Sequence, residues 1–476
     1  MRFRAALVVV LVLVVGSGVA LGLSRCERSA PSISAAQPLS LGREPKTLVL
    51  DVADAGSGLR SVTAELVLPT GATPLVARSW PGSLLRGGET RPSQERLEIP
   101  VDPKGLGLKD GSATLKVTAR DWSWSDFFAG NETVVELPVL VDLKPPRIAI
   151  ENGQTYLQRA GAGIAVYSIS EDVVRDGVDV AGHFYPGFPY PGSEPAQRRR
   201  LAFFAIPRDA APQPSIRVVA EDPAGNVSAQ GWQTILKERS FPDVDLNLPA
   251  SFFANKVTEL AAARNIDASD PVRAFQEINS AGRQADEARV REIVADTVPE
   301  RLWEGAFEQL RNSKVTSQFA ERRHYFTEGK KISEATHYGF DLATTAHSPI
   351  TAANSGRVIY ADDLGIYGSC VVIDHGYGVT SLYGHLSRID VAVGDRVTKG
   401  QTIGLSGATG LAGGDHLHFA ILVRDTYVDP VEWWDAKWIR EKIDALLPPR
   451  AGAPGAAPAP AASAPPAARG RAPAKR

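Results

Sequence analysis

The sequence predicts a mainly β protein that is divided into several domains. With 476 residues, the chain is too long for one ordinary hydrophobic core. From about Lys46 onward, most of it consists of short runs of alternating apolar and polar residues, separated by clusters of Gly, Pro and Asp. This pattern is typical of antiparallel strands joined by tight turns. The main exception lies between about Leu248 and Asn312, where the apolar residues follow a helical spacing.

The composition limits the classes of function. A formal net charge of −2 gives the chain no overall attraction to polyanions, so we expect no nucleic-acid partner. The two cysteines, Cys26 and Cys370, cannot form a disulfide framework. We expect Cys370 to be a small buried apolar residue.

The N-terminus, "MRFRAALVVVLVLVVGSGVALGLSRC", begins with two arginines and continues with a long uncharged stretch. A membrane-spanning helix needs about 20 apolar residues, whereas a cleaved signal has an apolar region of only about 7–15. We therefore predict that residues 1–26 form an uncleaved anchor with Arg2 and Arg4 in the cytoplasm and the rest of the chain outside it. The alternative is a lipoprotein that is acylated on Cys26 after cleavage.

After a polar linker at residues 27–45, a pattern occurs twice: a strand that ends in Asp, a loop, Gly-Asn and another strand. The first copy contains Asp121 and Asn131, and the second contains Asp222 and Asn226. The two aspartates lie about one β sandwich apart in sequence. Asp and Asn at strand ends could bind calcium, but turn formation is sufficient to explain them.

This repeat resembles tandem immunoglobulin-like domains of bacterial surface proteins, which implies two sandwiches at residues 46–143 and 144–240. Such modules have many functions, so the resemblance implies a spacer or a binding surface and nothing more specific.

Residues 241–312 are predicted to form a helical connector. Asp270 is placed as an N-cap and Pro271 at the first helical position, as expected for the start of a helix. After the next domain, residues 447–476 are rich in Ala and Pro, contain several basic residues and have no acidic residue. Such a composition cannot bury a core, and we predict a disordered basic tail.

Six of the eight histidines lie between His337 and His418, and four of them belong to the segments "THYGFDLA", "SLYGHLS" and "GGDHLHF". In a strand, His416 and His418 share one face with Ala420, whereas Leu417 lies on the other. His337 and Asp341 can bind one metal ion only if the chain bends between them, since an extended chain would hold them about 13 Å apart. Two histidines and a carboxylate form a three-ligand zinc site with an open fourth position, which favours catalysis over a structural role.

Three motifs in this region, "HYGFD", "YGHL" and "HLH", occur in the order typical of lysostaphin- and LytM-type zinc endopeptidases of bacterial cell walls. The segment from about Val315 to Trp434 resembles this family. The resemblance implies that residues 313–446 form a compact, mostly antiparallel β peptidase domain with a groove. It implies that Zn²⁺ is bound by His337, Asp341 and His418, and that His385 and His416 are the catalytic pair.

The chain departs from the family pattern just before the first motif, where Phe-Gly-x-Arg is replaced by "FAER" at residues 319–322. We expect this change to alter the wall of the groove and not the metal site. Of the other histidines, we expect His375 to order a turn or support the site indirectly. His183, His324 and His347 are expected to be ordinary polar residues.

Taken together, these features predict a single-pass inner-membrane endopeptidase whose catalytic domain lies in the periplasm. We expect it to hydrolyse peptide cross-links of peptidoglycan and to have a possible envelope protein partner. The alternative is a wall-binding scaffold, or an autoinhibited activator of another cell-wall hydrolase. The resemblance favours the enzyme, because all five functional positions of the family are present.

Overall fold

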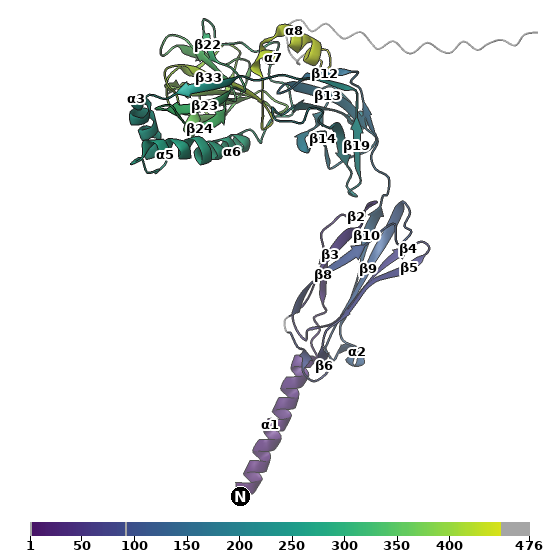
Figure 1. Cartoon of the computed structure of the whole chain (residues 1–476). Coiled ribbons are helices and arrows are strands. Elements are labelled where there is room, and N and C mark those ends of the chain that lie inside the picture. Colours follow the sequence, from purple (N-terminus) through teal and green to yellow (C-terminus); the bar gives the residue numbers. More distant parts are fainter. Residues whose placement is uncertain (1, 91–92, 449–476) are drawn as a thin grey trace, which may run out of the picture.

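The computed structural model describes residues 2–90 and 93–448, so most of the predicted tail lies outside the described residues. The fold is mainly β, as predicted. Helix α1 (Arg2–Arg25) lies at one end of the molecule, and the C-terminal domain lies at the other (Figure 1). Within the described ranges, no helix is both long and apolar enough to cross a membrane. The anchor predicted for residues 1–26 is therefore not supported.

The first β sandwich has two sheets with one shared core. Its sheets have the strand orders β1-β3-β8 and β2-β10-β9-β4-β5. Inward-facing residues alternate along the strands, and Leu50, Ile99 and Val117 are completely or almost completely buried between the sheets. The elements are β1 (Ser32–Ala35), β2 (Leu39–Leu41), β3 (Lys46–Asp54), β4 (Leu59–Leu68), β5 (Gly71–Ser79), β6 (Gly82–Ser83), β7 (Gly87–Gly88), β8 (Ser93–Val101), β9 (Gly111–Asp121), α2 (Ser125–Phe128) and β10 (Glu132–Val141). Since β1 and β2 pair with this sandwich, the predicted linker at residues 27–45 contains two of its strands.

The second sandwich has two four-stranded sheets, β11-β13-β17-β16 and β15-β14-β18-β19, and the added pair β12-β20. Its elements are β11 (Ile148–Ile150), β12 (Thr155–Gln158), β13 (Ala162–Ile169), β14 (Arg175–Val180), β15 (His183–Pro186), β16 (Phe188–Pro189), η1 (Pro195–Gln197), β17 (Arg199–Ala205), β18 (Ile216–Glu221), β19 (Val227–Gly231) and β20 (Thr234–Lys237). The relation of both sandwiches to immunoglobulin-like domains stays a prediction.

The repeated Asp and Asn residues make the same pair of hydrogen bonds in both sandwiches. The backbone N–H of Asn131 donates to Asp121 (2.7 Å), and that of Asn226 donates to Asp222 (2.9 Å). In each turn the Asn side-chain amide donates to the other carboxylate oxygen of the same Asp, at 2.9 and 2.7 Å. These hydrogen bonds stabilise the loop in both copies of the repeat.

The C-terminal domain is built on one mostly antiparallel sheet with the strand order β22-β25-β33-β29-β28-β27-β31, and β34 pairs with β33. Two small sheets, β26-β32-β30 and β21-β23-β24, lie beside it. The strands are β21 (Asp243–Asn247), β22 (Lys314–Ser317), β23 (Arg322–Thr327), β24 (Lys330–Thr336), β25 (Phe340–Ala343), β26 (Pro349–Thr351), β27 (Gly356–Asp363), β28 (Ser369–Asp374), β29 (Val379–Leu386), β30 (Arg388–Ile389), β31 (Arg396–Val397), β32 (Thr402–Leu405), β33 (Leu417–Val423) and β34 (Thr426–Val428). The helical elements are η4 (Gly365–Tyr367), α7 (Pro430–Trp434), α8 (Ala436–Trp438) and η5 (Ile439–Asp444).

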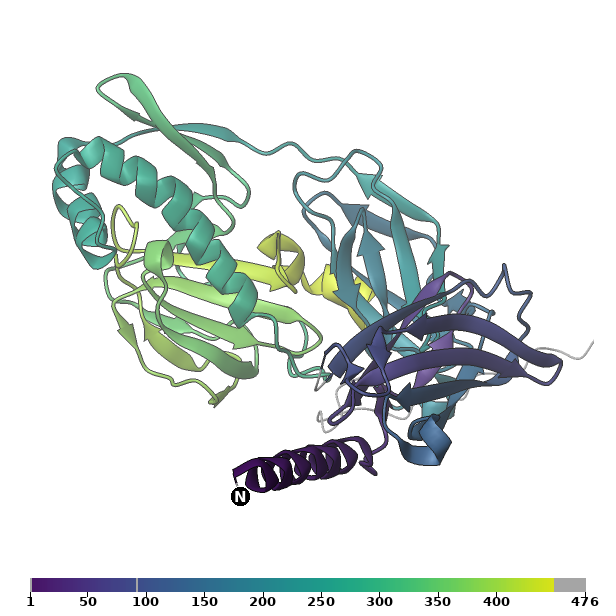
Figure 2. The same ribbon diagram turned by 90° about the horizontal axis from the view of Figure 1, so that it is seen from below.

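The predicted helical connector packs against this sheet (Figure 2). Its elements are α3 (Ala250–Phe252), η2 (Phe253–Val257), α4 (Thr258–Ala263), α5 (Pro271–Glu277), η3 (Ile278–Gly282) and α6 (Arg283–Ile293). Helix α5 begins as predicted, because the Asp270 carboxylate accepts two backbone N–H groups and Pro271 follows it. Phe275 and Val290 share a core with Leu382 and Ala420 of the sheet. We call residues 246–294 the helical wall.

The second sandwich and the C-terminal domain share one continuous core. The Phe203 ring contacts the rings of Trp303, Tyr377 and Trp433, with centroids 6.3–6.5 Å apart. At the edge of this contact, His183 Nε2 lies 2.7 Å from Asp425 Oδ1. The two domains are therefore held together by buried apolar surface.

Replacement of Phe203 by Ala is expected to destabilise both domains together. The side chain is 2% exposed, and deletion of a buried Phe costs about 3–5 kcal/mol of the free energy of unfolding. Denaturant unfolding, followed by tryptophan fluorescence, should show the loss. Val227→Ala is the control, because Val227 is 56% exposed in the same sandwich and should change stability by less than about 0.5 kcal/mol. Equal stability of the two variants would contradict the shared core.

The buried Glu432 carboxyl makes this interface sensitive to pH. One of its oxygens accepts the backbone N–H of Ala162 at 2.8 Å, and burial raises the pKa of Glu432 to about 7. Because this folded-state pKa lies above the ordinary value of 4.5, its contribution to stability is complete below pH 4.5 and is lost as the pH rises through 7.

Glu432→Gln is expected to remove this part of the pH dependence, because the amide cannot ionise and its oxygen can still accept the N–H. The free energy of unfolding of the natural chain should fall relative to the variant by about 1–3 kcal/mol between pH 4.5 and 8. Denaturant melts at several pH values measure the difference. Parallel pH profiles for the two proteins would show that Glu432 does not titrate in this range.

Candidate active site

The pairing of β25 with β33 brings the predicted ligands together. Asp341 lies directly opposite His418 in the antiparallel register. His337 comes just before β25, and the chain bends at Gly339, as the sequence required. A Cβ atom at Gly339 would lie 2.5 Å from His418 Cε1, so only glycine allows this close approach.

Three side-chain atoms form a small triangle. His337 Nε2 lies 3.0 Å from Asp341 Oδ1 and 3.0 Å from His418 Nδ1, and the distance from His418 Nδ1 to Asp341 Oδ1 is 3.1 Å. Ligand atoms around a tetrahedral zinc ion at about 2.0–2.1 Å are separated by about 3.3 Å. All three residues are buried, and their donor set is one that zinc prefers. The group therefore fits a zinc ion.

Two neighbouring contacts orient these ligands. His337 Nδ1 lies 2.9 Å from the carbonyl oxygen of Gln318, to which it can donate, and this leaves Nε2 free to bind a metal. Arg323 Nη2 donates to Asp341 Oδ2 at 2.7 Å, so the second carboxylate oxygen is also held. In the "FAER" segment, Arg322 instead pairs with Glu334 (3.3 Å), and the adjacent Arg323 reaches the site.

The electrostatics also suit metal binding, which requires an ionised carboxylate and neutral imidazole rings. Burial opposes ionisation of Asp341, but the charge and hydrogen bond of His337, with hydrogen bonds from His416 and His418, hold the pKa of Asp341 well below its usual value. Burial lowers the pKa of His418 to about 4, which keeps its ring neutral.

The predicted catalytic pair lies in the same cavity as the three ligands. The rings of His385 and His416 have centroids 4.8 Å apart. His385 Nδ1 lies 2.8 Å from the carbonyl oxygen of Thr409, and His416 Nδ1 lies 2.8 Å from that of Gly414. With Nδ1 held in this way, Nε2 of His385 is left for a substrate, whereas Nε2 of His416 lies 3.5 Å from Asp341 Oδ1. His385 has a φ of +65°, a strained conformation of the kind that is concentrated at functional sites.

The remaining histidines lie outside this cavity. His375 is fully buried, with Nδ1 2.8 Å from the carbonyl oxygen of Ser355 and Nε2 2.7 Å from Ser381 Oγ. Burial lowers the pKa of His375 to about 4, so this ring is a neutral structural element. His324 lies on β23, and His347 is exposed.

The sequence did not indicate Arg323 or Arg283 as residues of the site, although both line the cavity of the ligands. Arg283 comes from helix α6 of the helical wall, which is distant in sequence from every motif. A half-buried arginine on a helix gives no signal of its own. The second arginine of "FAERR" was the available clue to Arg323.

Residues 335–430 match peptidase family M23, and the C-terminal region therefore contains an M23 peptidase domain. Peptidoglycan DD-endopeptidase ShyB of Vibrio cholerae is 36% identical over 119 residues, which cover 25% of this chain and 27% of that protein. Murein hydrolase activator EnvC of Escherichia coli is 39% identical over 95 residues, which cover 20% of this chain and 23% of the relative. The chain thus spans about a quarter of the length of these curated relatives.

Among solved structures, the catalytic domain of lysostaphin from Staphylococcus simulans is 30% identical. The match covers 28% of this chain and 98% of that domain, with a TM-score of 0.23.

The geometry makes Arg323 a residue that positions Asp341. Arg323→Gln is expected to weaken zinc binding by about 10–100-fold, the usual effect of removing a partner of a metal ligand, and Asp341→Ala by more. Competition with a chromogenic chelator measures the affinity. Arg322→Gln is the matched control, because this neighbouring arginine pairs with Glu334 on the surface. An Arg323→Gln variant with unchanged affinity would show that the second oxygen of Asp341 needs no partner.

Proposed function

We propose that the chain is a zinc-dependent endopeptidase that hydrolyses peptide cross-links of bacterial peptidoglycan. One observation carries this proposal: three ligand atoms that fit a zinc ion share a cavity with the imidazole rings of His385 and His416, which can transfer protons. The M23 domain and the peptidoglycan endopeptidase among the relatives support it. His337, Asp341 and His418 would hold the metal.

When bound, zinc supplies Lewis acidity, which acidifies water and polarises a carbonyl group. The protein's own residues then handle the protons. Nε2 of either His385 or His416 accepts a proton from the attacking water, and the other ring stabilises the developing oxyanion and donates a proton to the leaving amine. The C–N bond breaks, the acyl carbon gains a hydroxyl group and the amine gains a proton.

An activator of another cell-wall hydrolase is the alternative, and EnvC among the relatives supports it. Such a protein needs a groove that binds a partner, but it has no need for metal ligands or for two available histidines. The presence of all five side chains in one cavity therefore favours the enzyme. Periplasmic location at the inner membrane stays a prediction.

The decisive assay is digestion of purified sacculi by the zinc-loaded full chain, with released fragments identified by mass spectrometry. We expect new peptide ends, and His385→Ala and His416→Ala should each lower the rate by about 10²–10⁴-fold with zinc content unchanged. Val431→Ala, at an exposed position on α7, is the control for differences between protein preparations and should keep full activity. Intact sacculi together with one bound zinc would instead support the activator.

A further inference from the structure

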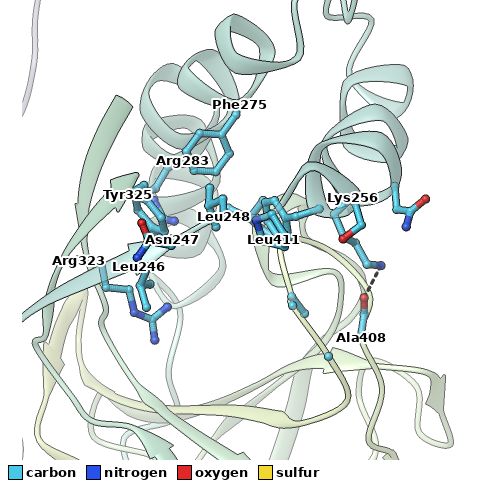
Figure 3. Close-up of a pocket in the computed structure, with 17 residues that line it drawn as sticks. Leu246, Asn247, Leu248, Lys256, Phe275, Arg283, Arg323, Tyr325, Ala408 and Leu411 are labelled. Carbon is cyan, nitrogen blue, oxygen red and sulfur yellow. Dashed lines mark hydrogen bonds between the residues drawn. The ribbon is translucent and has the colours of Figure 1, made fainter. Parts of the chain in front are cut away.

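A second, larger cavity (Figure 3) shares lining residues with the cavity of the metal centre. Its volume is about 490 Å³, and one side is formed by the helical wall. The opposite side is formed by residues 408–414, in the loop that leads to His416. Arg283, Arg323 and Leu411 line both this cavity and that of the ligands, so the two spaces meet at these side chains.

The charge of this cavity is entirely positive. Arg283, Arg323 and Lys256 line it, and no Asp or Glu does. Two of the three cations are already paired: Arg323 with Asp341 at 2.7 Å, and Lys256 with Glu259 at 3.2 Å. Lys256 also donates to the carbonyl oxygen of Ala408 at 2.5 Å and so links the helical wall to the loop (Figure 3).

Arg283 differs from these two cations. Among the described residues it has no carboxylate within 4.0 Å, and its polar contacts are both with Asn279 Oδ1, at 3.2 Å from Nε and 2.8 Å from Nη2. Glu287, one helical turn further along α6, lies beyond ion-pair distance. A half-buried guanidinium with one amide oxygen as its partner can still bind a carboxylate in a two-pronged geometry.

Apolar side chains form part of the lining around Arg283. Phe275 and Tyr325 are buried, with ring centroids 5.2 Å apart, and Leu248 and Leu411 lie beside them in the cavity lining (Figure 3). An ion pair formed against these side chains is less exposed to solvent than one on the open surface and is stronger for that reason. They also provide contact area for aliphatic parts of a peptide.

We propose that this cavity is a substrate subsite in which Arg283 binds a free carboxylate of the peptide whose scissile bond lies at the metal centre. The inference rests on the proposed function and specifies its substrate class, namely acidic peptides with a carboxylate near the cleaved bond. Arg283 is suited to this role because it lies where the two cavities meet and lacks an ion-pair partner among the described residues. Asp341 cannot be the ion-pair partner of Arg283, since its carboxylate belongs to the metal centre.

The test compares two forms of one ligand. Cross-linked muropeptides are released from sacculi with a muramidase, and half of the sample is amidated with carbodiimide and ammonia. Binding of both forms is measured by calorimetry with the zinc-loaded full chain that carries His385→Ala, which slows turnover. We expect the carboxylate form to bind at least about 10-fold more tightly, because a hydrogen-bonded ion pair is lost on amidation.

Arg283→Gln in the same background should remove this preference, whereas Arg283→Lys should keep part of it. Arg289→Gln is the matched control, because Arg289 lies on the same helix, pairs with Glu292 and does not line the cavity. Equal binding of both forms, or no binding of either, would overturn the subsite. A preserved preference in a protein that never cleaves sacculi would overturn the proposed function and leave the subsite standing.

Discussion

The antiparallel register between β25 and β33 is the constraint on which the rest of the site depends. It places Asp341 opposite His418, while Gly384 on the other neighbouring strand, β29, also lies opposite His418. A slip of one residue would turn His418 to the opposite face of the sheet and break the triangle of ligand atoms. The bend at Gly339 then lets His337 approach the same point. The positions of the metal ligands thus depend first on how the strands pair and only then on the individual side chains.

The same alternation of faces explains how the rest of the molecule is arranged around the site. On β33, Leu417, Phe419 and Ile421 belong to the core that is shared with the second sandwich. Ala420 and Leu422, on the face that carries His418, belong to the core that is covered by the helical wall. Because the helices cover the histidine face, Arg283 of α6 lines the cavity of the ligands and the helical wall forms one side of the groove. The two apolar cores hold the sheet from both sides and so keep the ligand atoms close together.

The sequence predicted the parts of the site that are local. The three histidine motifs have fixed spacings, and strand alternation favours one face for His416 and His418. Both line the same cavity, although β33 begins only at Leu417. The sequence could not predict contacts between distant segments. Arg323 reaches Asp341, and Arg283 lines the cavity of the ligands, only because the β23–β24 hairpin and the helical wall fold back onto the domain. The same limit applies to the connector, whose helical spacing was visible but whose partner surface was not.

The predicted domain boundaries have the same limitation, because the sequence did not show which distant segments bury each other's apolar surface. Residues 313–446 contain every predicted ligand, but their sheet has one face buried by the helical wall and the other by the second sandwich. An isolated segment with these limits would expose both apolar faces to water, which is unfavourable in proportion to the area uncovered. The folding unit that carries the site therefore extends back into the second sandwich, far beyond the M23 match at residues 335–430. Since the positive wall of the groove also lies outside that match, proteins that share these ligands can differ in the peptides that they bind.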